Sequence, residues 1–268
     1  MKHHSPIIAG VDFSSSSSQV LAHAAKLAAA MECPLVVAHV IGSSTIKEWE
    51  DSMGREASTA QRMDEMKERL AELVAENSAS RAAAIEVRIG RADKALAEIV
   101  RDHGADLLVL GAHDVSKRRL GSVASHCARS LPADVLLLRD WQGRFFRKIA
   151  ACVDFSPSSA IGLERAIAVA AAHRAALEII HVIFPPSRDP WGKVMDQPMD
   201  SEMSYETRVR ERAGRRMDEF LKPFAASLAG ITSSVLFLEA ECPAAAITAH
   251  VDVAEIDLTV MGSREGSW

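Results

Sequence analysis

The sequence predicts an α/β fold that occurs twice in the chain: an open, parallel five-stranded sheet with helices on both faces. The first observation is a repeat, because Ile7–Ser14 (IIAGVDFS) returns as Ile149–Ser156 (IAACVDFS). At the same separation, Val37–Ile41 (VAHVI) is echoed by Ile180–Ile183 (IHVI). The second observation is that short apolar runs alternate with helical patterns in both copies. A repeat this long indicates a duplicated domain, because solenoid repeats span only about 20–50 residues.

Two domains are therefore expected, one over residues 5–140 and one over 147–268, which we call copy one and copy two. A chain of 268 residues suits two domains of about 100–200 residues each. A third repeated segment, Asp106–Gly111 (DLLVLG) and Asp257–Gly262 (DLTVMG), lies close to the end of the sequence in copy two. Copy one continues after this segment through another helix and strand. We expect copy two to lack that last helix and strand.

Strands and helices are expected to alternate along copy one. Apolar runs predict strands at Ile7–Val11, Leu35–Ile41, Ile85–Ile89, Leu107–Leu110 and Val135–Leu138. Helical spacing predicts helices after the serine tract Ser14–Ser18, through Met63–Val74, and over Asp93–His103 and Ser122–Ser130. Crossover connections of this kind give a parallel sheet with helices on both faces.

Copy two repeats the scheme with four predicted strands. A proline-rich insertion, Phe184–Pro198, predicts a loop, and a long helix is expected over roughly Ser201–Leu228. Without a fifth strand, the last strand would lie at an edge of the sheet, where unpaired backbone groups favour association. The predicted strands are Lys148–Val153, Leu177–Ile183, Ser234–Leu238 and Leu258–Met261.

Composition excludes several classes of function. A hydrophobic content of 48%, a charged content of 25% and a net charge of −5 are typical of a soluble globular protein and give no basic nucleic-acid footprint. The sequence contains no apolar run of membrane-spanning length and no signal peptide. The four cysteines show no C-x-x-C spacing, which argues against zinc and thioredoxin-type sites and favours small core residues in a reducing cytoplasm.

Several residues of chemical interest fall at the carboxyl ends of the predicted strands, where open parallel sheets bind ligands. An aspartate there accepts hydrogen bonds from a ribose hydroxyl or an adenine amino group, and a valine backbone can meet a base edge. Glycines and the helix starting at Ser122 suit phosphates. The structural alternative is that the aspartates are cap residues and the glycines form turns. The residues concerned are Asp12, Asp154, Val40, Val182, Gly111 and Gly262.

These features together resemble the universal stress protein family, which includes tandem members. The matching segments are Val11–Ser14, His39–Ile41, Gly90–Ala92, Asp106–Gly111 and Gly121–Ala124. The resemblance implies an adenine nucleotide alpha hydrolase-like fold and a site for ATP or AMP, with Mg²⁺. The site residues it implies are Asp12, Phe13, Ser14, Val40, Gly111, Ala112, His113, Gly121, Ser122, Val123, Asp154, Val182 and Gly262.

The phosphate loop departs from the family pattern, which reads Gly-x-x-Gly, a spacer, and Gly-Ser or Gly-Thr. Asp114 replaces the second glycine, and the spacer Val115–Leu120 is short. A carboxylate repels phosphates, and Lys117–Arg119 either offset this repulsion or form a solvated loop. Copy two carries Glu265 in its loop and has no distal Gly-Ser. We therefore expect weak nucleotide binding or binding in copy one only. For copy two, the sequence is equally consistent with the absence of any cofactor.

The sequence contains no nucleophile, metal or Walker motif of an enzyme. His39 and His181 are interpreted as core or subsurface residues, and His113 as the better candidate for contacting a ligand. The sequence thus predicts a cytoplasmic stress-response module that is regulatory. It would bind adenine nucleotide and self-associate through the edge strand Val135–Leu138 or bind an unknown protein. The alternatives are a scaffold that binds no nucleotide and a slow hydrolase.

Overall fold

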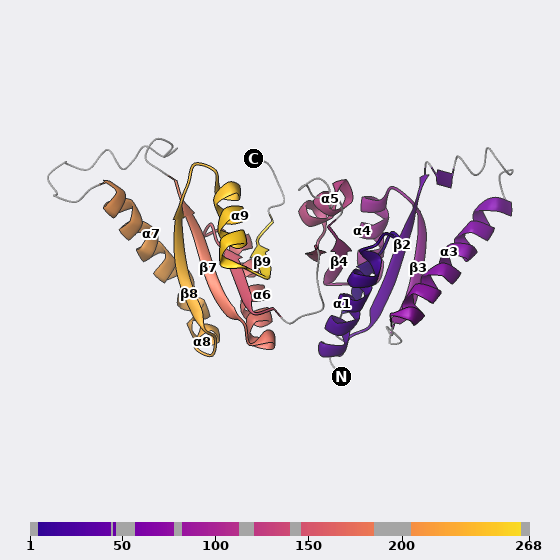
Figure 1. The fold of residues 1–268 in the computed structure, drawn as a ribbon, viewed down its shortest axis with the longest axis horizontal. Helices are drawn as coiled ribbons and strands as arrows, with labels where there is room; N and C mark the ends of the chain where they lie inside the picture. Colours follow the sequence, from indigo (N-terminus) through magenta and orange to yellow (C-terminus); the bar gives the residue numbers. More distant parts are fainter. Residues whose placement is uncertain are drawn as a thin grey trace. The chain divides into compact units, whose positions relative to one another are not determined.

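A computed structural model describes residues 5–43, 45–46, 57–77, 82–112, 121–139, 146–184 and 205–263. The chain divides into two compact units, one reaching Arg144 and one starting at Phe145 (Figure 1). The first unit contains copy one and the second contains copy two. Each unit has its own parallel sheet, so each is described by itself.

Copy one forms a five-stranded parallel sheet in the order β3-β2-β1-β4-β5, which confirms the predicted fold class. Successive apolar runs become strands because each is buried on both faces by the intervening helices. The elements are β1 (Ile7–Gly10), α1 (Ser17–Ala30), β2 (Leu35–Gly42), α3 (Ala57–Glu76), β3 (Ala82–Gly90), α4 (Ala92–Asp102), β4 (Leu107–Gly111), α5 (Ser122–Ser130) and β5 (Asp134–Leu138).

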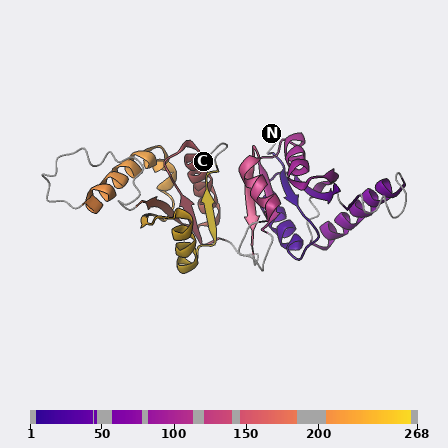
Figure 2. The same ribbon diagram turned by 90° about the horizontal axis from the view of Figure 1, so that it is seen from above.

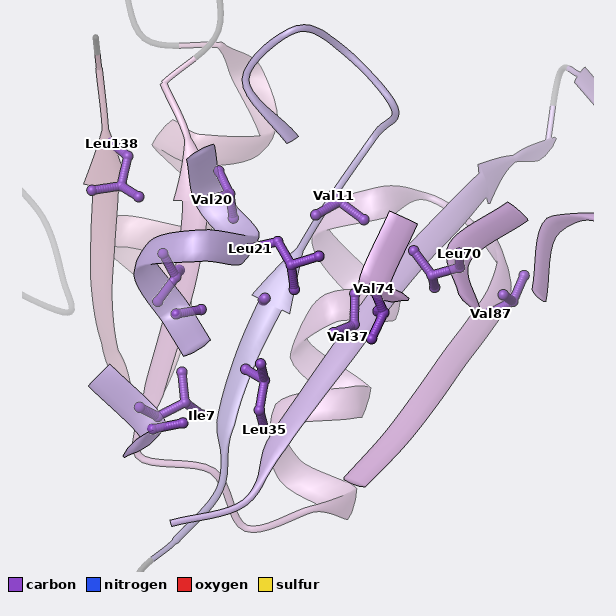
Figure 3. Close-up of a cluster of buried hydrophobic side chains, with 14 of the residues drawn as sticks. Ile7, Val11, Val20, Leu21, Leu35, Val37, Leu70, Val74, Val87 and Leu138 are labelled. Atoms are coloured by element: carbon purple, nitrogen blue, oxygen red, sulfur yellow. The ribbon is translucent and has the colours of Figure 1, made fainter. Parts of the chain in front are cut away.

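Two hydrophobic clusters lie on opposite faces of this sheet, as the helix placement also shows (Figure 2). On one face, Leu21 of α1 and Leu70 of α3 pack against Ile7 and Val37 (Figure 3). On the other face, α4 and α5 cover alternate residues of the same strands, beginning with Ile8 of β1. The chain therefore changes face after β3, which places the reversal of strand order between β1 and β4.

Most strands differ from their predicted ranges by one residue at an end, and β3 begins at Ala82 instead of Ile85. Two of these differences bear on the site. Strand β1 ends at Gly10, so Val11 and Asp12 follow the strand. Strand β2 continues past Ile41 to Gly42, because β3 pairs with it along its whole length up to Gly90. Val40 therefore lies within β2, near its carboxyl end.

Copy two forms a four-stranded parallel sheet in the order β8-β7-β6-β9. Strand β9 corresponds to β4 of copy one, but in the described residues it pairs only with β6 and lies at the edge. The elements are β6 (Lys148–Cys152), α6 (Pro157–His173), β7 (Ala176–Ile183), α7 (Tyr205–Leu221), the 3₁₀ turn η3 (Lys222–Phe224), α8 (Ala225–Leu228), β8 (Ser233–Glu239), α9 (Pro243–Ala254) and β9 (Leu258–Met261).

The long helix predicted over Ser201–Leu228 is interrupted in the structure. Helix α7 ends at Leu221, and η3 separates it from the single turn of α8. Pro223 explains the interruption, because proline has no backbone N–H and its ring clashes with the preceding turn of an α-helix. The start of this predicted helix, residues 201–204, and residues 185–198 of the predicted insertion loop lie outside the described residues.

Candidate functional site

A pocket of about 270 Å³ lies at the carboxyl ends of β1, β2 and β4 in copy one. It occupies the place where the strand order reverses, which is where open α/β sheets bind ligands. The starts of three helices, α1, α4 and α5, also reach it. Its lining consists of Gly10, Val11, Asp12, Ser16, Ser17, Val20, Ala38, Val40, Ala92, Leu96, Leu110, Gly111, Gly121, Ser122, Val123 and Ala124.

Part of the expected site meets in this pocket. Its lining includes the expected residues Asp12, Val40, Gly111, Gly121, Ser122 and Val123.

The other expected residues of copy one are placed differently. Phe13 and Ser14 form the turn beside the pocket without lining it, and the Ala112 amide donates to the Leu138 carbonyl at 2.8 Å. His113 lies outside the described residues, as do Asp114 and Lys117–Arg119.

Asp12 is held in a tight turn at the end of β1. Its Oδ1 accepts from the Ser14 amide at 3.0 Å and from the Ser17 hydroxyl at 3.2 Å. The turn is possible because Phe13 adopts a left-handed conformation, with φ of 59°. The Asp12 side chain is therefore oriented by local hydrogen bonds while it lines the pocket, so the structural and the ligand-binding interpretations are compatible.

An aromatic stack supports this turn. The Phe13 ring lies 4.6 Å from the His39 ring, and the guanidinium of Arg69 lies 4.4 Å from the Phe13 centroid. His39 Nδ1 donates to the Val11 carbonyl at 2.9 Å. Burial is the main cause that lowers the pKa of His39 below 6.5, so the ring is neutral at pH 7.

The helix starts give the pocket a concentration of backbone donors. Helix α5 begins after Gly121, which makes no side-chain capping bond, and its first residues Ser122, Val123 and Ala124 line the pocket. The first N–H groups of a helix have no intrahelical partner and carry a partial positive charge. This arrangement suits an anionic group such as a phosphate.

Several lining residues were not expected from the sequence, above all Ser16, Ser17 and Val20. The serine tract was interpreted as a loop leading to a helix cap, and Ser16 is the N-cap of α1 but makes no side-chain capping bond. Its Oγ instead lies 3.0 Å from that of Ser14. The available signal was the tract's position directly after the first strand, which brings its hydroxyls to the sheet edge.

Copy two repeats the turn, and beside it a strand end packs closely against the next helix. Asp154 Oδ1 accepts from the Ser156 amide at 2.9 Å, and Phe155 is again left-handed, with φ of 64°. Gly262 packs against the start of α6, because a Cβ on it would lie 2.5 Å from the carbonyl group of Ser158. Gly162 of α6 faces the same place. A Cβ on Gly162 would lie 3.2 Å from the Gly262 nitrogen.

The third expected residue of copy two, Val182, is buried near the end of β7. Asp154, Val182 and Gly262 thus belong to the second unit.

Two of the cysteines offer little nucleophilic character. Burial raises the pKa of Cys127 and that of Cys152 to about 11, so both thiols stay protonated at neutral pH. Cys242 is exposed, so it is not the core residue that the sequence suggested. Across the described ranges, no three His, Cys, Asp or Glu side chains are grouped to hold a metal ion. No helix in those ranges is long and apolar enough to cross a membrane.

Comparison with solved structures shows the same fold over both copies. A universal stress protein from Archaeoglobus fulgidus is 19% identical, with a TM-score of 0.65 over 96% of this chain and 86% of that one. A putative universal stress protein from Pseudomonas aeruginosa is 16% identical, with a TM-score of 0.62 over 96% of this chain and 82% of that one.

A third structure, a universal stress protein in complex with cAMP, is 28% identical over 52% of this chain and 98% of that one, with a TM-score of 0.37. Comparison with curated proteins found no match. Residues 4–139 and 145–268 each match the universal stress protein family. Because these two matches cover most of the sequence, the chain belongs to the universal stress protein family as a tandem member.

Proposed function

We propose that copy one binds one adenine nucleotide, ATP or AMP, and that the protein is a regulatory module of the cytoplasmic stress response. The observation that carries the proposal is the pocket in copy one, where Asp12, Val40, Gly111 and the start of α5 come together. These residues are far apart in the sequence, and the sequence alone predicts them as site residues. Copy two is proposed to bind nucleotide weakly or not at all.

Each part of the pocket suits one part of a nucleotide. The Asp12 carboxylate would accept a hydrogen bond from a ribose hydroxyl, and the backbone at Val40 would meet the edge of the base. The amides at Ser122 and Val123, which have no partner within the helix, would face the phosphates, and the helix dipole would favour their charge. Mg²⁺ would arrive with the phosphates, since it is usually bound by one or two carboxylates together with substrate phosphates.

Regulation is a better description than catalysis for this site. The described lining residues include hydroxyls and one carboxylate, but they include no histidine or cysteine beside that carboxylate. In sites of acid–base and nucleophilic catalysis, a base typically lies within hydrogen-bond reach of a nucleophile and is oriented by a third group. The Asp12 carboxylate is held instead within its own turn, by the Ser14 amide and the Ser17 hydroxyl. We therefore propose that the protein acts through a conformational or partner-binding change on nucleotide binding, with at most slow, incidental hydrolysis of ATP.

The test is the nucleotide content of the purified protein, followed by calorimetric titration with ATP and AMP, with and without Mg²⁺. We expect up to one nucleotide per chain. Asp12→Ala should weaken binding by roughly 10- to 100-fold, because a hydrogen bond to a charged group contributes about 1.5–3 kcal/mol. The matched control Asp154→Ala removes the corresponding carboxylate of copy two and should leave the affinity unchanged.

The opposite result has a defined meaning. If the wild-type protein carries no nucleotide and its melting temperature does not change with ATP and Mg²⁺, copy one is not a nucleotide site. The alternative would then be a scaffold that acts through protein contacts. Its most suitable surface would be strand β5, which lies at the edge of the copy one sheet and includes the partly exposed Val135, Leu136 and Leu137.

A further inference from the structure

We propose that His39 is a positioning residue of the nucleotide site: its imidazole holds the turn that presents Asp12 to the pocket. The inference rests on the proposed function and extends it to a residue that does not line the pocket. It is carried by one hydrogen bond, one ring contact and the recurrence of both in copy two.

The hydrogen bond from His39 continues the contact between β2 and the chain beyond the end of β1. Parallel pairing between the two strands ends at Gly10 and Ala38. The Val11 amide still donates to the Ala38 carbonyl at 2.9 Å. The Val11 carbonyl accepts from Nδ1 of His39, also at 2.9 Å. Since a carbonyl oxygen can only accept, Nδ1 carries the proton, and the side chain of His39 replaces a backbone donor at the residue before Asp12.

The ring contact supports a backbone conformation that is unfavourable by itself. Phe13 has a φ of 59°, a left-handed conformation that is unfavourable for residues other than glycine. Its ring contacts the His39 ring and the guanidinium of Arg69 of α3. The ring is also partly buried against the core formed by α1 and α3. This conformation allows the Ser14 amide to reach Asp12 Oδ1. His39 thus contacts the residues before and after Asp12.

The same arrangement recurs in copy two with different surroundings. His181 Nδ1 donates to the Val153 carbonyl at 2.8 Å, and the ring lies 4.3 Å from that of Phe155. Arg216 lies over the Phe155 ring at 4.5 Å, although it comes from α7, whose sequence differs from that of α3. The recurrence identifies histidine, left-handed phenylalanine and aspartate as one structural unit, and it supplies an internal control.

The neutral state of His39 fits this role better than acid–base chemistry. Its ring belongs to the α1 and α3 side of the sheet through Phe13, whereas Val40, the next residue, packs on the α4 and α5 side and lines the pocket. Burial lowers the pKa of His39, and Asp12 and Arg69 are the charged groups that act on it with opposite sign. The His39 ring would therefore affect a bound ligand indirectly, by holding the turn that carries Asp12.

The experiment compares two substitutions at this position in the full-length protein. His39→Asn keeps an N–H donor close to the place of Nδ1, and His39→Leu fills the space without a donor. Hydrogen exchange of the Ser14 amide, measured by NMR without ligand, reports the turn. Affinities for ATP and 2′,3′-dideoxy-ATP report the Asp12–ribose contact separately from the rest of the ligand. His181→Leu is the matched control.

We expect His39→Leu to accelerate Ser14 exchange and to weaken ATP binding, each by about tenfold, with dideoxy-ATP affected much less. His39→Asn should recover most of both losses, and His181→Leu should accelerate exchange at Ser156 alone. Unchanged Ser14 exchange in His39→Leu would overturn the inference. Equal losses for ATP and dideoxy-ATP, without recovery by asparagine, would also overturn it. Absence of ATP binding to the wild-type protein would overturn the proposed function, whereas the exchange rates decide on the turn without any ligand.

Discussion

The two copies share a turn after their first strand and differ in the contacts beside it. Both place an aspartate in a turn with a left-handed phenylalanine. In copy one, Val20 of α1 and Gly111 of β4 line an open pocket. In copy two, Gly162 and Gly262 stand at the corresponding places, and the end of β9 packs backbone to backbone against α6. The same turn thus lies beside a helix–strand contact that is made by a side chain in copy one and by the backbone in copy two.

A second difference concerns how deeply the corresponding elements are buried. Strand β4 lies between β1 and β5, and Val109 is completely buried. Strand β9 lies at an edge in the described residues, and Val260, the corresponding valine, is only partly buried. Helix α4 buries four residues, whereas α9 buries none, although α9 is the more apolar helix. Similar sequences therefore contribute differently to stability in the two copies.

The largest expected effect breaks the close approach in copy two. Gly262→Ala would place a Cβ 2.5 Å from the backbone of Ser158, which cannot rotate away. We expect a loss of about 3 kcal/mol in the stability of copy two, the upper end of the usual cost of overpacking. Native-state hydrogen exchange of the β9 amides measures this loss within the full-length protein.

Gly111→Ala is the matched control for this substitution. Its Cβ would meet the Ser16 Oγ at 2.6 Å, and a serine side chain can adopt another rotamer. We expect a loss of less than about 1 kcal/mol in copy one, within the range of tolerated changes. Equal losses in the two copies would show that the helix–strand gap does not distinguish them.

An intermediate effect is expected from removing the same side chain at corresponding positions. Val109→Ala deletes two buried methyl groups, and at about 0.8 kcal/mol per buried group with a small cavity term this costs about 2 kcal/mol. Val260→Ala should cost less than half as much, because water already reaches that side chain. Exchange rates of the β4 and β9 amides report the two losses. A larger loss for Val260→Ala would contradict the difference in burial.

The smallest effect is a shared dependence on pH. Burial lowers the pKa of both His39 and His181 below 6.5, so the unfolded chain binds more protons than the folded one in mildly acidic solution. The stability that comes from neutral histidines is complete above about pH 6.5 and is lost as the pH falls below that value. Exchange measured from pH 7.5 to 5.5 should show this loss in both copies. His39→Asn should remove this loss of stability from copy one only. If exchange in copy one depended on pH as strongly in this variant as in the wild type, another group would be responsible.

Local signals account for most of the secondary structure. Helix α5 runs over Ser122–Ser130 as predicted, because Gly121 precedes it and Pro132 follows soon after it. The end of β2 was missed, since its length is set by pairing with β3, which no local pattern reports. The interruption at Pro223 carried a visible signal, but the surrounding apolar spacing favoured one helix.

The site was less accessible to sequence reasoning than the fold. The strand-end residues could be selected because the topology fixes where strand ends meet. The left-handed phenylalanines could not, since this conformation normally favours glycine. The contact between Gly162 and Gly262 joins distant parts of the chain and depends on the separation of a helix from a strand. Such separations are set by packing, so this contact is known only from the structure.

Copy one forms a sheet of its own, and this has a consequence for synthesis of the protein on the ribosome. Strand β1 has both of its neighbours only once β4 has been synthesised, and the last strand of the sheet ends at Leu138. All five described strands of this sheet belong to copy one. Since domains generally fold as units, the amino-terminal one first, copy one can assemble its sheet while copy two is still being translated. The proposed nucleotide site would then be formed before the second half of the chain exists.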